Sequence, residues 1–253
     1  MALIGNEIEY AKKILTGAVK EKNLFKALVM LTKYYYFEMG MDIKDIEKNL
    51  RMYIKAMGDN IDDETLENII KSNTSSKTNI NKLDNIIITV QEWQTIQEMG
   101  RTERERKLLF TLLCMYKVKI GLGYSDNGLV KIEYTKLNSL AHVVFTRKQR
   151  IEMWRYLIDC GMIELGLGQL ASRVKLHYVF PDSKQLIKIT DFEAFNVYYD
   201  YLKNGGKLIR CKECGKLVLS KSKTCPSKYC KDCANKIEQE RKNEQKRISR
   251  ATK

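Results

Sequence analysis

Apolar side chains recur at helical spacing through the first seventy residues. They form four segments within residues 7–71, and Asn23, Asp42 and Asp62 stand where helix N-caps are expected. This pattern predicts an all-helical domain over residues 1–71. The chain as a whole is predicted to be mainly α with small β content.

A polar stretch and then a β-branched run follow this helical part. Residues 72–85 are rich in Asn, Ser, Thr and Lys without apolar periodicity, which predicts a linker. The run Ile86–Val90 predicts a short strand. Thr89 is expected to begin a short helix that carries Trp93 and Ile96.

The middle of the chain alternates helical patterns with strand patterns. Helical spacing is followed by a glycine-containing loop, two further helical segments, a short strand, a second loop and an alternating strand. The helices are expected at 101–120, 134–141 and from Thr146, and the strands at 162–165 and 174–180. A further helix is expected at 191–204.

The helix expected after Thr146 has a clear start signal. Thr146 with Gln149 three residues later is a capping-box pattern. Its predicted buried stripe consists of Ile151, Trp154, Leu157 and Ile158. Two cysteines on apolar helical faces, Cys114 and Cys160, are predicted to be buried thiols.

The order helix, helix, turn, helix and two-stranded ribbon resembles the winged helix-turn-helix superfamily. The segment 154–164, in which a leucine, a glycine and an aliphatic residue lead into a strand, is similar to its junction of recognition helix and wing. The resemblance covers about eighty residues and implies that residues 86–204 form a DNA-binding module with a flanking strand and helix. Winged helices also serve as protein-interaction domains, so that alternative stays open.

Basic residues gather on the expected recognition helix and wing. Side chains in such positions can reach phosphates and guanine edges in a major groove. Two acidic residues, Glu152 and Asp159, share the helix with four basic ones, which favours DNA over a merely solvated face. The candidate DNA contacts are Arg147, Lys148, Arg150 and Arg155 on the helix and Arg173 and Lys175 on the wing.

Four cysteines near the C-terminus have the spacing of a zinc site. Cys211 and Cys214 form one C-x2-C pair, and Cys230 and Cys233 form a second pair fifteen residues later. Four thiolates in a tetrahedron are typical of structural zinc. Cys225 lies between the pairs and is the alternative third ligand, but only Cys230 has x2 spacing to Cys233.

The net charge of +14 is concentrated toward the C-terminus. Residues 1–100 carry a net charge of −2, residues 101–200 carry +5 and residues 201–253 carry +11. Residues 205–253 are therefore predicted to be a zinc ribbon with a basic helical tail that contacts nucleic acid. The candidate contacts there are Arg241, Lys242, Lys246, Arg247 and Arg250.

This C-terminal module resembles ribbon-plus-basic-helix tails on proteins of bacteriophages and integrated elements of Firmicutes. The resemblance covers about forty residues, and Cys225 departs from its simplest four-cysteine pattern. It implies a protein of a phage or mobile element that acts in transcription regulation or replication initiation.

Several function classes are disfavoured. No apolar run approaches the length of a membrane span and the N-terminus has no secretory pattern, so a cytoplasmic protein without a membrane partner is expected. Nucleotide-binding, nucleophile-elbow and metalloprotease motifs are missing, so no enzyme is predicted.

The N-terminal helices are expected to form a homodimer or to recruit a protein. The alternative function is an adaptor or inhibitor of a host or replisome protein.

Overall fold

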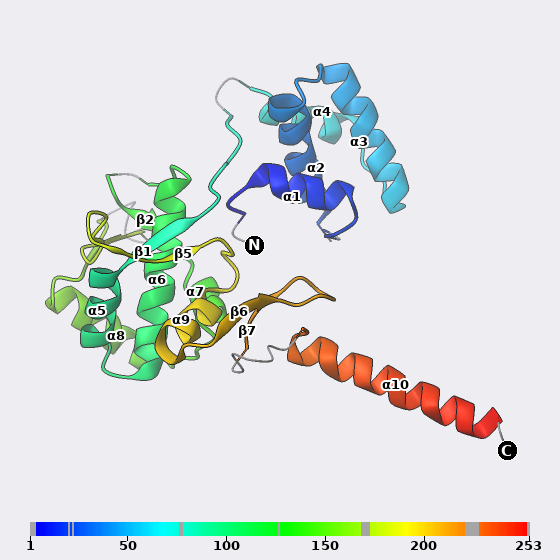
Figure 1. Cartoon of the computed structure of the whole chain (residues 1–253). Helices are drawn as coiled ribbons and strands as arrows, with labels where there is room; N and C mark the ends of the chain where they lie inside the picture. Colours follow the sequence, from blue (N-terminus) through cyan, green and yellow to red (C-terminus); the bar gives the residue numbers. More distant parts are fainter. Residues whose placement is uncertain are drawn as a thin grey trace. The chain divides into compact units, whose positions relative to one another are not determined.

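The computed structural model describes residues 4–19, 21, 23–75, 78–125, 127–167, 173–220 and 228–251. The chain divides into two compact units, Met1–Asp84 and Asn85–Lys253, which we call unit 1 and unit 2 (Figure 1). Helices predominate and the sheets are small, which confirms the predicted class. Among the described residues, no helix is long and apolar enough to cross a membrane.

Unit 1 is helical, as the apolar periodicity predicts. Side chains of Asn23, Asp42 and Asp62 each accept a hydrogen bond from the backbone N–H three residues on, which confirms the predicted caps. The aromatic run after α2 continues as one turn of wider π-helix. The elements are α1 (Glu7–Leu15), α2 (Leu24–Lys33), η1 (Tyr34–Glu38), α3 (Ile43–Met57) and α4 (Asp63–Asn73).

The core of unit 1 is apolar, and the buried carboxylate of Glu7 lies at its border. Leu28, Leu31 and Leu50 are fully buried between the helices. Glu7, 4% exposed, accepts a hydrogen bond from Lys33 at 3.0 Å and another from the backbone N–H of Asn81. This carboxylate joins α1 to α2 and to the segment that follows α4.

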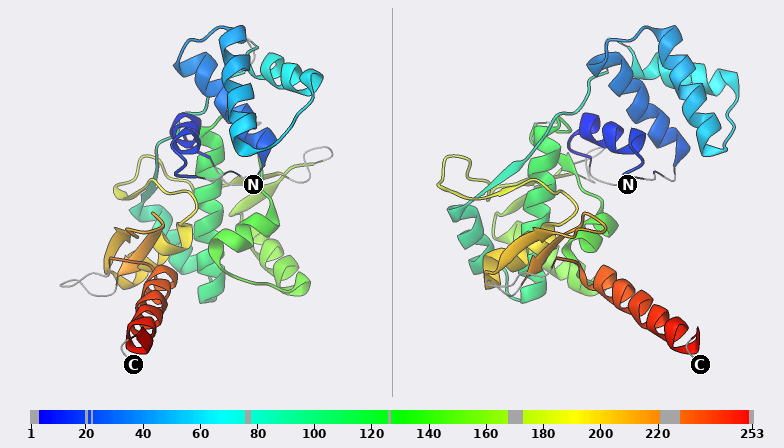
Figure 2. Two further views of the ribbon diagram at one scale, coloured as in Figure 1. Left: turned by 90° about the vertical axis from the view of Figure 1, so that its right-hand side faces the viewer. Right: turned by 45° about the vertical axis from the view of Figure 1, so that its right-hand side comes forward.

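Unit 2 is built around the long helix α6 (Glu103–Gly121), which runs through its middle (Figure 2). Almost every side chain from Leu108 to Val118 is buried, as expected for a helix covered on all sides. Strand β1 (Ile86–Thr89) precedes α5 (Val90–Met99), and Thr89 with Glu92 forms a capping box. β1 pairs antiparallel with β5 (Gln185–Ile189), a strand that the sequence pattern did not predict.

The other part of unit 2 joins three helices to a three-stranded sheet. After α6 come β2 (Val130–Lys131), α7 (Tyr134–Ala141), α8 (Arg147–Asp159), β3 (Ile163–Leu165) and β4 (Arg173–Leu176). The sheet order is β2-β4-β3 and both pairings are antiparallel. The capping box predicted for Thr146 and Gln149 is present at the start of α8.

The structure corrects four expectations in this region. Leu157 is buried as predicted, but Ile151 and Ile158 are each 40% exposed and Trp154 is only half-buried, because α8 packs through Met153 and Leu157. Cys160 follows the last turn of α8 and is exposed, whereas Cys114 on α6 is buried as predicted. The strand expected at 174–180 ends at Leu176, and the helix expected from residue 191 begins at Phe195.

The C-terminal part contains a hairpin and a long helix. The elements are α9 (Phe195–Asn204), β6 (Lys207–Arg210), β7 (Leu217–Ser220) and α10 (Lys231–Ala251). β6 and β7 pair antiparallel, with Lys207 opposite Ser220. This hairpin and the start of α10 carry the four cysteines.

Candidate metal centre

The first cysteine pair lies in the tight turn between β6 and β7. The N–H of Cys211 donates to the carbonyl of Lys216 at 2.9 Å, and the N–H of Gly215 donates to the carbonyl of Cys211 at 2.9 Å. Gly215 has a φ of 70°, a conformation that glycine adopts without strain. The turn thereby closes around Cys211 and Cys214.

The second pair lies at the beginning of α10. Cys230 immediately precedes the helix and Cys233 is in its first turn, where the N–H of Cys233 points at the Cys230 sulfur at 3.4 Å. The N–H of Lys212 donates to the carbonyl of Lys228 at 3.0 Å. This bond holds the hairpin turn beside the segment that leads into α10 and so brings the two pairs together.

The four sulfur atoms converge on one point. All of them lie within 4.8 Å of one another, and the Sγ atoms of Cys214 and Cys230 are 3.7 Å apart. A tetrahedral zinc with Zn–S bonds of about 2.3 Å places its sulfurs about 3.8 Å apart. All four are free thiols rather than disulfide partners. The donor set and its spacing therefore fit a zinc ion.

The charges within the cluster also favour a cation. The backbone N–H of Cys214 hydrogen-bonds the Cys211 sulfur and lowers the pKa of Cys211 to about 6. The hydrogen bond with Cys230, together with burial, raises the pKa of Cys233 well above its usual range. A second thiolate beside the first is thus electrostatically unfavourable. A bound dication offsets this repulsion between the negative charges.

The predicted ligand set is the one that the structure brings together. Cys211 and Cys230 are buried and Cys233 is half-buried. Cys225, the alternative third ligand, lies outside the described residues. The described geometry thus gives Cys230 the place that its x2 spacing from Cys233 predicts.

The candidate DNA contacts on α8 fall into two groups. Arg147, Lys148 and Arg155 are exposed, and Lys148 faces Glu152 only at 4.0 Å. Arg150 is half-buried, because its guanidinium lies over the ring of Tyr134, 4.6 Å from the centroid. The first group is available to a ligand and Arg150 already has a packing partner.

The remaining candidates lie on β4 and α10. Arg173 and Lys175 are half-buried on the central strand of the sheet, and residues 168–172 of the loop before it lie outside the described part of the chain. On α10, Arg241, Lys242 and Arg247 are exposed. Lys242 pairs with Glu238 at 2.6 Å and Arg247 with Glu244 at 3.8 Å. The side chains of Lys246 and Arg250 are outside the described set.

Sequence reasoning missed one basic surface, which lies in unit 1. Lys44, Lys48, Arg51 and Lys55 follow one face of α3 at intervals of four, three and four residues. Such intervals place side chains on one side of a helix, and this spacing could have revealed the surface.

No protein-family model, curated protein or solved structure matches this chain. Interpretation of its function therefore depends on the geometry of its own residues.

Proposed function

We propose that this chain is a non-enzymatic, zinc-containing protein that binds double-stranded DNA. The observation that carries the proposal is the exposed basic start of α8 within the element order α6, β2, α7, α8, β3, β4. That order, with the sheet order β2-β4-β3, supports a winged helix in which α8 is the recognition helix. Arg147 and Lys148 then occupy its first turn, which is the part that enters the major groove.

The four-cysteine cluster supports a structural role for zinc in this function. A closed set of four thiolates leaves no position for a reacting water, so the ion fixes the hairpin to α10 rather than performing chemistry. From Ala234 onward, every α10 side chain whose burial is described is exposed. A solvated basic helix adds affinity for phosphates without regard to base sequence.

The proposed setting is a phage or mobile element, in transcription regulation or replication initiation. The basic zinc-ribbon tail and the winged-helix order favour this setting. The two helices then have different roles: α8 recognises the DNA sequence, and α10 adds affinity for the phosphate backbone of the DNA.

Selection from a random duplex pool tests the proposal. The full-length chain should enrich a defined sequence, and the Arg147→Ala/Lys148→Ala variant should lose that enrichment while melting at the same temperature, because both side chains are exposed. A matched control is Lys184→Ala/Lys188→Ala, which removes the same charge from exposed positions beside and on β5. If the wild-type chain enriches no sequence, or if both variants lose enrichment equally, the proposal that α8 recognises the DNA sequence is refuted.

A second candidate function is an adaptor that binds a host or replisome protein. The exposed apolar side chains of Ile151 and Ile158 favour it, because they stand seven residues apart on α8 and so on one face. In that case Ile151→Ser/Ile158→Ser would abolish partner capture, while Arg147→Ala/Lys148→Ala would leave duplex affinity unchanged.

A further inference from the structure

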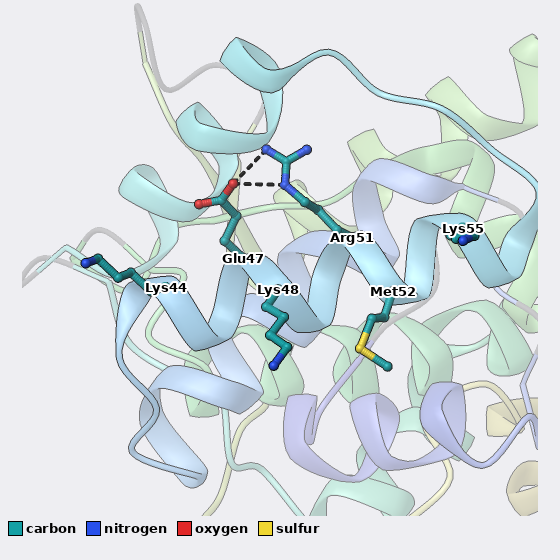
Figure 3. Close-up of a pocket in the computed structure, with 6 residues that line it drawn as sticks. All are labelled: Lys44, Glu47, Lys48, Arg51, Met52 and Lys55. Carbon is teal, nitrogen blue, oxygen red and sulfur yellow. Dashed lines mark hydrogen bonds and ion pairs between the residues drawn. The ribbon is translucent and has the colours of Figure 1, made fainter.

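The outer face of α3 in unit 1 carries a row of cations. Lys44, Lys48, Arg51 and Lys55 line a shallow depression together with Glu47 and Met52 (Figure 3). Ile46, Leu50 and Ile54 turn the other face of α3 into the core of unit 1. Lys55 lies eleven positions after Lys44, a rise of roughly 16 Å at 1.5 Å per residue.

Arg51 differs from the three lysines because it already has partners. Its guanidinium donates to Glu47 at 2.6 Å and 2.9 Å and to Asp63 on α4 at 2.8 Å. These hydrogen bonds, with that to Glu47 first, raise the pKa of Arg51 above its usual range. Arg51 therefore positions α3 against α4 and is not a free cation.

Lys44, Lys48 and Lys55 are exposed, and within the described part of the chain none of their ammonium groups forms a hydrogen bond or an ion pair. Arg51 pairs with the nearby carboxylates of Glu47 and Asp63. Residues 1–100 carry a net charge of −2, so this concentration of positive charge is local rather than a reflection of overall composition. Three unpaired ammonium groups on one face of a helix are complementary to a ligand with repeated negative charges.

We propose that the face formed by Lys44, Lys48 and Lys55 is a second nucleic-acid contact, which binds the phosphate backbone of DNA. Duplex DNA presents one negative charge for about every 1.7 Å of its axis, so a row of this length meets several phosphates whatever the base sequence. The three ammonium groups are spread over about 16 Å of one helix face, and this extent favours a long repeating polyanion over a short acidic protein segment. The inference rests on the proposed DNA-binding function, but it assigns a new role to unit 1, which was expected only to bind protein.

The test compares two triple variants of the full-length chain on one random duplex. Lys44→Ala/Lys48→Ala/Lys55→Ala removes the row, and Lys12→Ala/Lys13→Ala/Lys71→Ala removes equal charge from other exposed positions of unit 1. Affinity is measured between 50 mM and 200 mM salt. The first variant should bind roughly 10- to 100-fold more weakly, and its plot of log affinity against log salt should be about two to three units shallower. Lys44→Arg/Lys48→Arg/Lys55→Arg should bind as the wild-type chain does.

Each other outcome overturns the inference. Equal losses in both alanine variants would mean that total charge alone matters. An unchanged salt slope in the first variant would leave an acidic protein segment as the partner of this face. Binding by the wild-type chain is measured in the same experiment, so failure of DNA binding itself is distinguished from failure of the α3 contact. Circular dichroism checks that all variants fold, as expected for substitutions at exposed lysine ends.

Discussion

A buried ion pair in unit 2 offers the sharpest test of how this fold is held together. The carboxylate of Glu92 is fully buried and contacts the Lys117 ammonium at 2.6 Å and 2.8 Å. It also accepts the backbone N–H groups of Thr89 and Phe180, each at 2.9 Å. One side chain thereby joins α5, α6, β1 and the segment after β4, so its loss should weaken the whole unit.

Glu92→Gln removes the negative charge and keeps the shape. Breaking a buried pair typically costs about 3–5 kcal/mol, because one charge stays buried without compensation. Lys117 keeps two acceptors, the carbonyl of Ile87 at 2.7 Å and the glutamine oxygen, while the glutamine amide can no longer accept both backbone N–H groups. Because these effects oppose each other, we expect the free energy of unfolding to fall by about 3 kcal/mol, the lower end of that range. This corresponds to a fall in melting temperature of about 10 °C.

The assay is urea unfolding followed by tryptophan fluorescence. The chain has two tryptophans, Trp93 and Trp154, and both lie in unit 2, so the signal reports this unit alone. Glu92→Gln combined with Lys117→Met should be less destabilising than Glu92→Gln alone, since no charge is then left buried. Glu152→Gln is the control, because its pair with Lys148 is exposed and is worth less than about 1 kcal/mol. A loss below about 1 kcal/mol for Glu92→Gln would refute this account of the pair.

Three further predictions follow from other parts of the chain. Purified protein should contain about one zinc per chain by atomic emission, Cys214→Ser should lose most of it and Cys225→Ser should retain it; zinc loss in the Cys225 variant would overturn the ligand assignment. Burial raises the pKa of Glu21, but hydrogen bonds from Lys26, Tyr10 and a backbone N–H lower it to about 2, below its usual 4.5. The stability that Glu21 contributes is therefore present above pH 4.5 and lost as the pH falls toward 2; circular dichroism melts should show this loss, and Glu21→Gln should remove it. Deleting residues 236–253 should weaken binding to all duplexes alike, make the salt slope shallower by several units and leave zinc content unchanged; lost discrimination between sites with an intact slope would contradict the proposed division of labour.

The features that could be predicted from the sequence depend on residues close together in the chain. The cap at Asp42, the capping box of Thr146 and Gln149 and the turn that holds Cys211 and Cys214 all arise within a few residues. The paired C-x2-C spacing indicated the four sulfurs that converge, because each short turn presents its two thiols together. Local periodicity likewise predicted the helices of unit 1.

The features that the sequence left undecided depend on partners that are distant in the chain. Ile86 pairs with Ile189, which is about a hundred residues away in the sequence, and no local pattern in residues 185–189 predicts that pairing. On α8, the predicted stripe of Ile151, Trp154, Leu157 and Ile158 is buried only at Leu157, and the other buried side chain is Met153. A helical period shows which residues share a face, but only the packing of neighbouring elements selects the face that loses its contact with water.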